Sequence, residues 1–292
     1  MSTKKELGGW LLASPYLLSA ILFFLIPLGW SLSLVFFDWN VISPVRTYVG
    51  LGNFREALTS TRVFKAFVNT YKFMGIIVPG VIVASLGLAL LVQHLPRGKQ
   101  FYAVGFFLPY LASGVAVSLV VRGILSYDSA FNEFLRSVFG SSPRWLRDPF
   151  WATLVISAMI IWKLSGYYAL IFLAGLQGIP RELYEAAALD GAGPLTQFRK
   201  ITVPLLYPAF YTVLVLSVGL CFGIFTEPYV LTGGGPRFAT HTWQLEIYSQ
   251  AFERFRAGYG ATVAVLNAVI TFGSILIIRR VVESWGRRLG FR

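Results

Sequence analysis

Long stretches without a charged residue constrain this chain more than any other feature. Residues 7–37 contain none, and further apolar stretches follow at 73–96, 100–121, 149–180 (interrupted once, by Lys163), 201–226 and 257–278. About 20 apolar residues in a helix cross the ~30 Å hydrocarbon core of a bilayer. The sequence therefore predicts an all-α membrane protein with six transmembrane helices, near 10–36, 68–93, 101–124, 152–176, 205–230 and 259–279.

The composition agrees with this class. Hydrophobic residues make up 56% of the chain and charged residues only 13%, against about 25% charged in soluble domains. The net charge of +12 is not read as a nucleic-acid signal, because basic residues in an apolar chain hold loops on the cytoplasmic side and meet anionic lipids. The first apolar stretch is too long for a cleavable signal peptide. The single Cys221 excludes an intramolecular disulfide framework.

Basic residues also indicate the orientation. They occur on both sides, but the tight loop "HLPRGKQ" and the tail "RRVVESWGRRLGFR" are short and densely basic. This is the pattern of cytoplasmic segments. We expect both termini in the cytoplasm and one transmembrane domain over residues 1–292, because no repeat or soluble linker is visible.

A polar loop at 180–204, "PRELYEAAALDGAGPLTQFRKITVP", separates the fourth and fifth predicted spans. Pro180 suits the first position of a helix, and Glu182 and Glu185 complement the helix dipole in its first turns. Gly191 can take the left-handed conformation that ends a helix. Pro194 can then open a second short helix. The result is a helix, a sharp turn and a helix beneath the membrane.

Three consecutive alanines leave the surface of the first loop helix small and flat. Another protein could therefore approach it closely. The alternative is an amphipathic helix lying on lipid. That alternative fits poorly, since an alanine-rich face with glutamates binds anionic membranes weakly.

The loop resembles the signature of permease subunits of binding-protein-dependent ATP-binding-cassette importers. Their motif is "EAA", then glycine, and later isoleucine and proline, and a valine precedes the proline here where the family more often has leucine. The resemblance implies a type I importer fold and a coupling helix that docks on a cytoplasmic ATPase. The positions that match the motif are Glu185, Ala186, Ala187, Gly191, Ile201 and Pro204, and Glu182 is assigned to the same ATPase-coupling loop.

A second stretch narrows the resemblance. "YVLTGGGPRFATHTWQLEIYSQAFERFRAGYGATVAVL", residues 229–266, is similar to the outer loop and last helix of the first permease subunit in maltose- and glycerol-3-phosphate-type sugar importers. "ASPYLLSAILFFLIPLGWSLSLVFFDW" and "VGLGNF" are similar too. Membership implies a second, related permease, a homodimeric ATPase and an extracytoplasmic solute-binding protein as partners, in a prokaryotic inner membrane.

Contacts with a solute or a binding protein are harder to place. Glycines at 233–235 allow a tight turn or the close approach of a partner, and the sequence leaves both open. Polar and aromatic residues at membrane depth are candidates for binding a sugar. We name six candidates for solute or binding-protein contact: Asn69, Tyr167, Phe225, Gly233, Gly234 and Asn267. Lys163 is interpreted as structural, paired with a partner subunit or placed along a bent helix, and Glu227 as solvated near the outer end of its span.

Other chemistry has no support in the sequence. "RGKQ" lacks the first glycine and the hydroxyl of a phosphate-binding loop, so ATP is expected on partner subunits and no cofactor or metal on this chain. His94 and His241 lack metal-ligand spacing. The main rival is an ion-gradient-driven secondary carrier, but such folds show repeated halves and mid-membrane carboxylates. A scaffold protein would not explain the loop helix.

Overall fold

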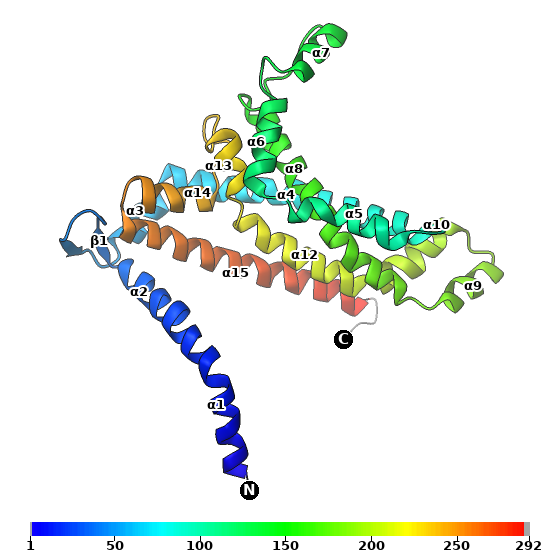
Figure 1. Cartoon of the computed structure of the whole chain (residues 1–292), viewed down its shortest axis with the longest axis horizontal. Helices are drawn as coiled ribbons and strands as arrows, with labels where there is room; N and C mark the ends of the chain where they lie inside the picture. The colour runs from blue at the N-terminus through cyan, green and yellow to red at the C-terminus, as the bar shows by residue number, and fades with distance from the viewer. Residues whose placement is uncertain (1, 289–292) are drawn as a thin grey trace. The chain divides into compact units, whose positions relative to one another are not determined.

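The computed structural model describes residues 2–288 and the side chains of residues 9–287 (Figure 1). The chain forms two compact units. The first comprises residues 1–63 and 246–267, and the second comprises residues 64–245 and 268–292. The single domain expected over residues 1–292 stays a prediction. The C-terminal end at 289–292, which the sequence assigns to the cytoplasm, lies outside the described residues.

The first unit begins with a helical rod that carries no charged residue from residue 7 onward. It comprises α1 (Ser2–Ala20), a π-helical turn η1 (Ile21–Leu25) and α2 (Ile26–Leu34). No residue from 9 to 33 is buried within the chain. A helix that is hydrophobic all round needs lipid or another protein around it.

A small hairpin and a short helix follow the rod. Strands β1 (Phe37–Trp39) and β2 (Arg46–Tyr48) pair antiparallel, with Asp38 opposite Thr47. Helix α3 (Gly52–Thr59) carries the buried Asn53, whose side-chain amide donates hydrogen bonds to the carbonyls of Val35 and Phe37, both at 3.0 Å. The amide thereby holds the helix against the strand.

The second unit contains most of the long helices. From residue 61 to residue 232, the long and short helical segments run in the order α4 (Thr61–His94), α5 (Lys99–Leu111), α6 (Gly114–Ile124), α7 (Ala130–Phe139), α8 (Pro149–Gln177), α9 (Arg181–Leu189), α10 (Pro194–Gln197), the π-helical turn η2 (Phe198–Thr202), α11 (Val203–Leu205), α12 (Tyr207–Phe222) and α13 (Thr226–Thr232). Helix α14 (Trp243–Tyr248), the π-helical turn η3 (Ser249–Glu253) and helix α15 (Ala257–Arg288) complete the chain.

Four helical segments among the described residues are long and apolar enough to cross a membrane. They are residues 9–34, 61–94, 149–177 and 257–287. Two further segments are bent pairs, α5 with α6 at 87° and 194–205 with α12 at 65°, which raises the count to six if each pair is one span.

The single helix expected over 101–124 is therefore two helices. Helix α5 contains Pro109, and Ala112 is in an extended conformation. Ser113 then caps α6 by accepting a hydrogen bond from the backbone N–H of Ala116 at 3.5 Å. A side-chain cap of this kind satisfies a donor that a continuous helix would bond internally. The expected span 205–230 is likewise interrupted, between α12 and α13.

Helix α8 is the centre of the second unit. Proline at its first position and the Asp148 carboxylate, which accepts bonds from the N–H groups of Phe150 and Trp151, define where it begins. Fourteen of its 29 residues are buried. At Gly166 the backbone of α5 comes so close that an added Cβ would overlap the Phe106 carbonyl. Glycine is required there for packing.

Candidate functional site

The loop at the C-terminal end of α8, residues 181–205, forms a compact helical structure that we call the hook. Helix α9 ends in a Schellman motif, in which the N–H of Ala192 bonds the carbonyl of Ala187 at 2.8 Å and the N–H of Gly191 bonds that of Ala188 at 3.0 Å. Gly191 adopts φ +78°, as the sequence predicted. The helix begins at Arg181, one residue later than expected, because Pro180 is extended and precedes the first turn.

Side chains brace the two arms of the hook. The Tyr184 hydroxyl and the Thr202 hydroxyl lie 2.9 Å apart, and the Gln197 amide donates to the Ala192 carbonyl at 3.0 Å. Tyr184 and Ile201 also pack against the hydrophobic core of the unit. Pro204 lies in α11, just before the bend into α12. The hook is therefore one rigid piece attached to the membrane helices.

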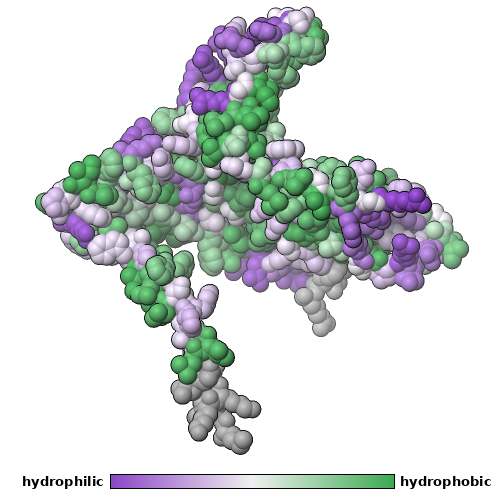
Figure 2. Space-filling model, viewed as in Figure 1, coloured by the Kyte–Doolittle hydropathy of each residue, from purple (hydrophilic) through white to green (hydrophobic). Residues whose placement is uncertain are grey.

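The outer face of the hook is open. Glu182, Glu185 and Ala186 are exposed and Ala187 is half-buried. Leu189 is 90% exposed and Leu195 is 61% exposed, although both are apolar. Figure 2 shows hydrophilic residues gathered around this α9–α10 end of the unit. Exposed apolar side chains within a polar rim are typical of a protein-binding surface.

The middle of α8 carries an ion pair. Lys163 Nζ lies 4.0 Å from Glu227 Oε1 on α13, and the side chains are only 19% and 12% exposed. Lys163 thus has a partner within the same chain, and Glu227 is not the solvated residue that the sequence indicated. The physical reason is the bend before Gly114, which brings α6 and α13 against α8; Lys163 Nζ and Glu227 Oε1 both lie near the site of a Cβ on Gly114.

Two aromatic stacks flank this region. Tyr167 stacks on Tyr110 with ring centroids 4.6 Å apart, and Phe225 stacks on Tyr229 at 5.1 Å. The Tyr229 side chain is 41% exposed. A partly exposed ring presents an apolar face and a polar edge, which suits contact with a sugar. The candidates Tyr167 and Phe225 are thus members of stacked pairs on different helices.

The other candidates have visible structural positions. The Asn69 amide donates to the carbonyls of Phe238 and His241, at 2.7 and 2.9 Å, and so holds the outer loop. Gly233 and Gly234 have φ of +59° and +84° and form the turn after α13, with Gly234 packed closely against His241. Asn267 lies on α15 in the first unit and is 8% exposed.

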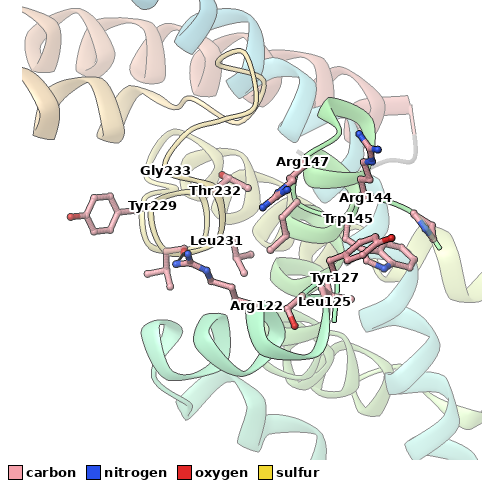
Figure 3. Close-up of a pocket in the computed structure, with 14 residues that line it drawn as sticks. Arg122, Leu125, Tyr127, Arg144, Trp145, Arg147, Tyr229, Leu231, Thr232 and Gly233 are labelled. Atoms are coloured by element: carbon pink, nitrogen blue, oxygen red, sulfur yellow. Dashed lines mark hydrogen bonds between the residues drawn. The ribbon is translucent and has the colours of Figure 1, made fainter. Parts of the chain in front are cut away.

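A pocket at the N-terminal end of α8 was not expected from the sequence. It has a volume of about 770 Å³ and is lined by the end of α6, the turn before α8 and the end of α13 (Figure 3). Its charged side chains are Arg122, Arg144 and Arg147, and Tyr127, Trp145 and Tyr229 are its aromatic ones. The only signal in the sequence was the basic, aromatic stretch "SPRWLRDPF".

One buried residue organises the wall of this pocket. The Asn132 amide donates to the carbonyls of Leu125 and Ser126, at 3.4 and 2.7 Å, and its oxygen accepts from Trp145 Nε1 at 2.9 Å. Asn132 is 1% exposed. Arg122 donates to the Val230 carbonyl at 3.2 Å, which joins α6 to α13.

The comparison with protein families decides the identity of the fold. Residues 11–288 match the model of the binding-protein-dependent transport system inner membrane component. The chain belongs to this family. It is a multi-pass membrane protein and a transport subunit, the permease of a binding-protein-dependent importer.

Individual relatives are permease proteins whose names refer to different solutes. The sn-glycerol-3-phosphate transport system permease protein UgpA of Escherichia coli is 32% identical, over 94% of this chain and 94% of UgpA. The lactose transport system permease protein LacF of Rhizobium radiobacter is 30% identical, over 93% of this chain and 92% of LacF. The sulfoquinovosyl glycerol transport system permease protein SmoG of Agrobacterium fabrum is 32% identical, over 81% of this chain and 77% of SmoG.

A solved structure has the same fold. A chain of the bacterial alginate ABC transporter, in complex with an alginate pentasaccharide-bound periplasmic protein, superposes with a TM-score of 0.84. The match covers 97% of this permease and 96% of the alginate transporter chain at 21% sequence identity. The expected type I importer permease fold is confirmed.

Proposed function

We propose that this permease carries a sugar or sugar-like solute in an ATP-driven importer. The names of LacF, UgpA and SmoG support this solute class, since each refers to a sugar or a glycerol derivative. The stacked aromatic pairs near the Lys163–Glu227 ion pair supply the polar and flat apolar groups that a sugar pathway needs.

The coupling to ATP is assigned to the hook of residues 181–205. One observation carries the proposal. A braced, rigid helix with exposed leucines lies at the opposite end of α8 from the arginine pocket. Closure of a nucleotide-binding partner would push this piece, and the displacement would pass through α8 and α12 into the membrane helices. A ligand acts in this way by favouring one of two states of a bistable element.

The proposed partners are those that membership of the family implies. A second related permease, a homodimeric cytoplasmic ATPase and an extracytoplasmic solute-binding protein complete the proposed importer in a prokaryotic inner membrane. Lipids surround it, and nucleic acid has no part. The ATPase binds ATP, and this chain holds no cofactor or metal of its own.

The glycines of the hook allow a matched test. Gly191→Val places a β-branched residue at φ +78°, where a side chain costs about 1–2 kcal/mol. Gly193→Ala is the control, because Gly193 has φ −70° and open space at its Cβ position. In proteoliposomes we expect Gly191→Val to lose solute-stimulated ATP hydrolysis and uptake, whereas Gly193→Ala keeps both.

Crosslinking tests the docking itself. A cysteine at Leu189, in a Cys221→Ser background, should crosslink to the ATPase subunit, and the ATPase and second permease should copurify. Normal uptake by Gly191→Val together with no crosslink at Leu189 would refute the assignment of ATP coupling to the hook. Uptake driven by an ion gradient without ATP would establish the secondary carrier instead.

A further inference from the structure

The pocket at the N-terminal end of α8 has an excess of positive charge, because its three arginines form no ion pair among the described residues. Within the described part of the chain, none of Arg122, Arg144 and Arg147 has an acidic side chain within 4.0 Å. The pocket lining contains no aspartate or glutamate. Three arginines line one cavity, and this positive charge favours an anion as its occupant.

The pocket is built rather than an accident of loose loops. Asn132 links the segment after α6 to Trp145 through buried hydrogen bonds. Arg136 lies 4.7 Å from the Tyr127 ring centroid and donates to the Tyr127 carbonyl at 2.9 Å. The walls are therefore held before any ligand arrives, which lowers the entropy that binding must overcome.

Size and lining define the class of ligand. A volume of about 770 Å³ lies within the ~300–1,000 Å³ typical of small-molecule sites. Arginine forks match carboxylates and phosphates with paired hydrogen bonds. Trp145 and Tyr229 add ring surface of the kind that contacts sugar rings.

We propose that this pocket is an entry site for a small anionic sugar derivative, one that carries a carboxylate or a phosphate, before it passes into the membrane helices. The inference rests on the proposed function, because it needs this end of α8 to face outside. It narrows the transported class from sugars in general to acidic ones.

The experiment measures binding to the assembled transporter, without its solute-binding protein, in nanodiscs of neutral lipid. The probes are D-glucuronate and glycerol 3-phosphate, with D-glucose and glycerol as their neutral counterparts. Saturation-transfer NMR gives the Kd. We expect at least one anion to bind 10-fold more tightly than its neutral counterpart, and this affinity to fall with added salt.

The double variant Arg144→Gln/Arg147→Gln tests the residues, since neither side chain forms an ion pair in the described chain. Its Kd for the anion should rise at least 10-fold. Arg144→Lys/Arg147→Lys keeps the charge and should lose less. Arg55→Gln on α3, an exposed arginine that does not line the pocket, should leave the Kd unchanged. Copurification of the ATPase with each variant shows that it has assembled.

Several results would overturn the proposal. They are no binding of either anion, equal binding of the neutral counterparts, or an unchanged Kd in the double glutamine variant. Loss of probe binding in nanodiscs that contain phosphatidylglycerol would assign the pocket to lipid headgroups and overturn it as well. ATP-driven uptake of a neutral sugar at the native rate by the double variant would leave the proposed function standing while this inference fails.

Discussion

The two ends of helix α8 carry loops that are held together in different ways. At its C-terminal end, helix α9 ends through backbone hydrogen bonds between residues three and five apart, with glycine in the left-handed conformation. At its N-terminal end, the pocket wall depends on the Asn132 side chain, which joins carbonyls before α7 to Trp145 after it.

This contrast explains what each end can do. The hook is closed by its own hydrogen bonds, and its leucines remain exposed. The pocket combines arginines from α6 and from the turn before α8 with the end of α13, so it changes if any of these segments shifts. The first is suited to transmit a push, and the second to recognise a solute.

The strongest test of this comparison is to disturb helix α8 itself, which joins the two loops. Gly166→Ala would drive a methyl group into the Phe106 carbonyl on α5. Overpacking of a tight core costs about 1–3 kcal/mol and more where backbone must move, and we expect the largest effect in this permease. Thermal unfolding in detergent should show a marked loss of stability. Gly105→Ala, with open space at the added methyl, should be close to native.

Asn132→Ala should affect only the N-terminal end of α8. It removes three hydrogen bonds around a fully buried side chain, and each unsatisfied buried group costs about 1–3 kcal/mol. Hydrogen exchange should rise in residues 125–147, while the hook at 181–205 keeps its protection. Ser137→Ala, an exposed position on α7, serves as control. Equal loosening of both loops would contradict the independence of the two ends.

Tyr184→Phe is the smaller counterpart at the C-terminal end of α8. It removes the hydroxyl contact with Thr202 and keeps the ring in the core, so we expect a loss of about 1 kcal/mol. Exchange should rise in α9 and η2, with no change near Trp145. Thr202→Val should have the same effect, and the double variant should cost little more than either single one. Additive effects of the two substitutions would show that the brace is unimportant.

An ion pair in the first unit should make the smallest contribution to stability. It serves as a reference for the substitutions at the two ends of α8. Arg256 donates two hydrogen bonds of 2.7 Å to Glu56, and these hold the pKa of that carboxyl below its ordinary value of 4.5. The unfolded chain then binds the proton more readily. The stabilisation is present above pH 4.5 and is lost as the pH falls through the lowered pKa.

The pair is partly exposed, so its contribution should stay below about 1 kcal/mol. Unfolding midpoints measured from pH 6 down to pH 3 should fall less in Glu56→Gln than in the native permease. Glu133→Gln on α7 should keep the native pH dependence. An identical pH dependence in Glu56→Gln would contradict the assignment.

The sequence by itself determined the membrane class, the apolar spans and the helix–turn–helix hook. These features depend on neighbouring residues, because hydropathy, prolines and the left-handed Gly191 act over a few positions along the chain. The matched motif around Glu185 and Pro204 placed the hook between two spans in the same way.

Only the tertiary structure decided the bend between α5 and α6, the Lys163–Glu227 pair and the arginine pocket. Residues 163 and 227 are far apart in sequence, and so are Arg122 and Val230, which are joined by a hydrogen bond. No pattern in the neighbouring sequence predicts which distant charged residue a lysine pairs with. That choice follows from how closely the helices pack, and the packing depends on small residues such as Gly114 and Gly166 at the crossings.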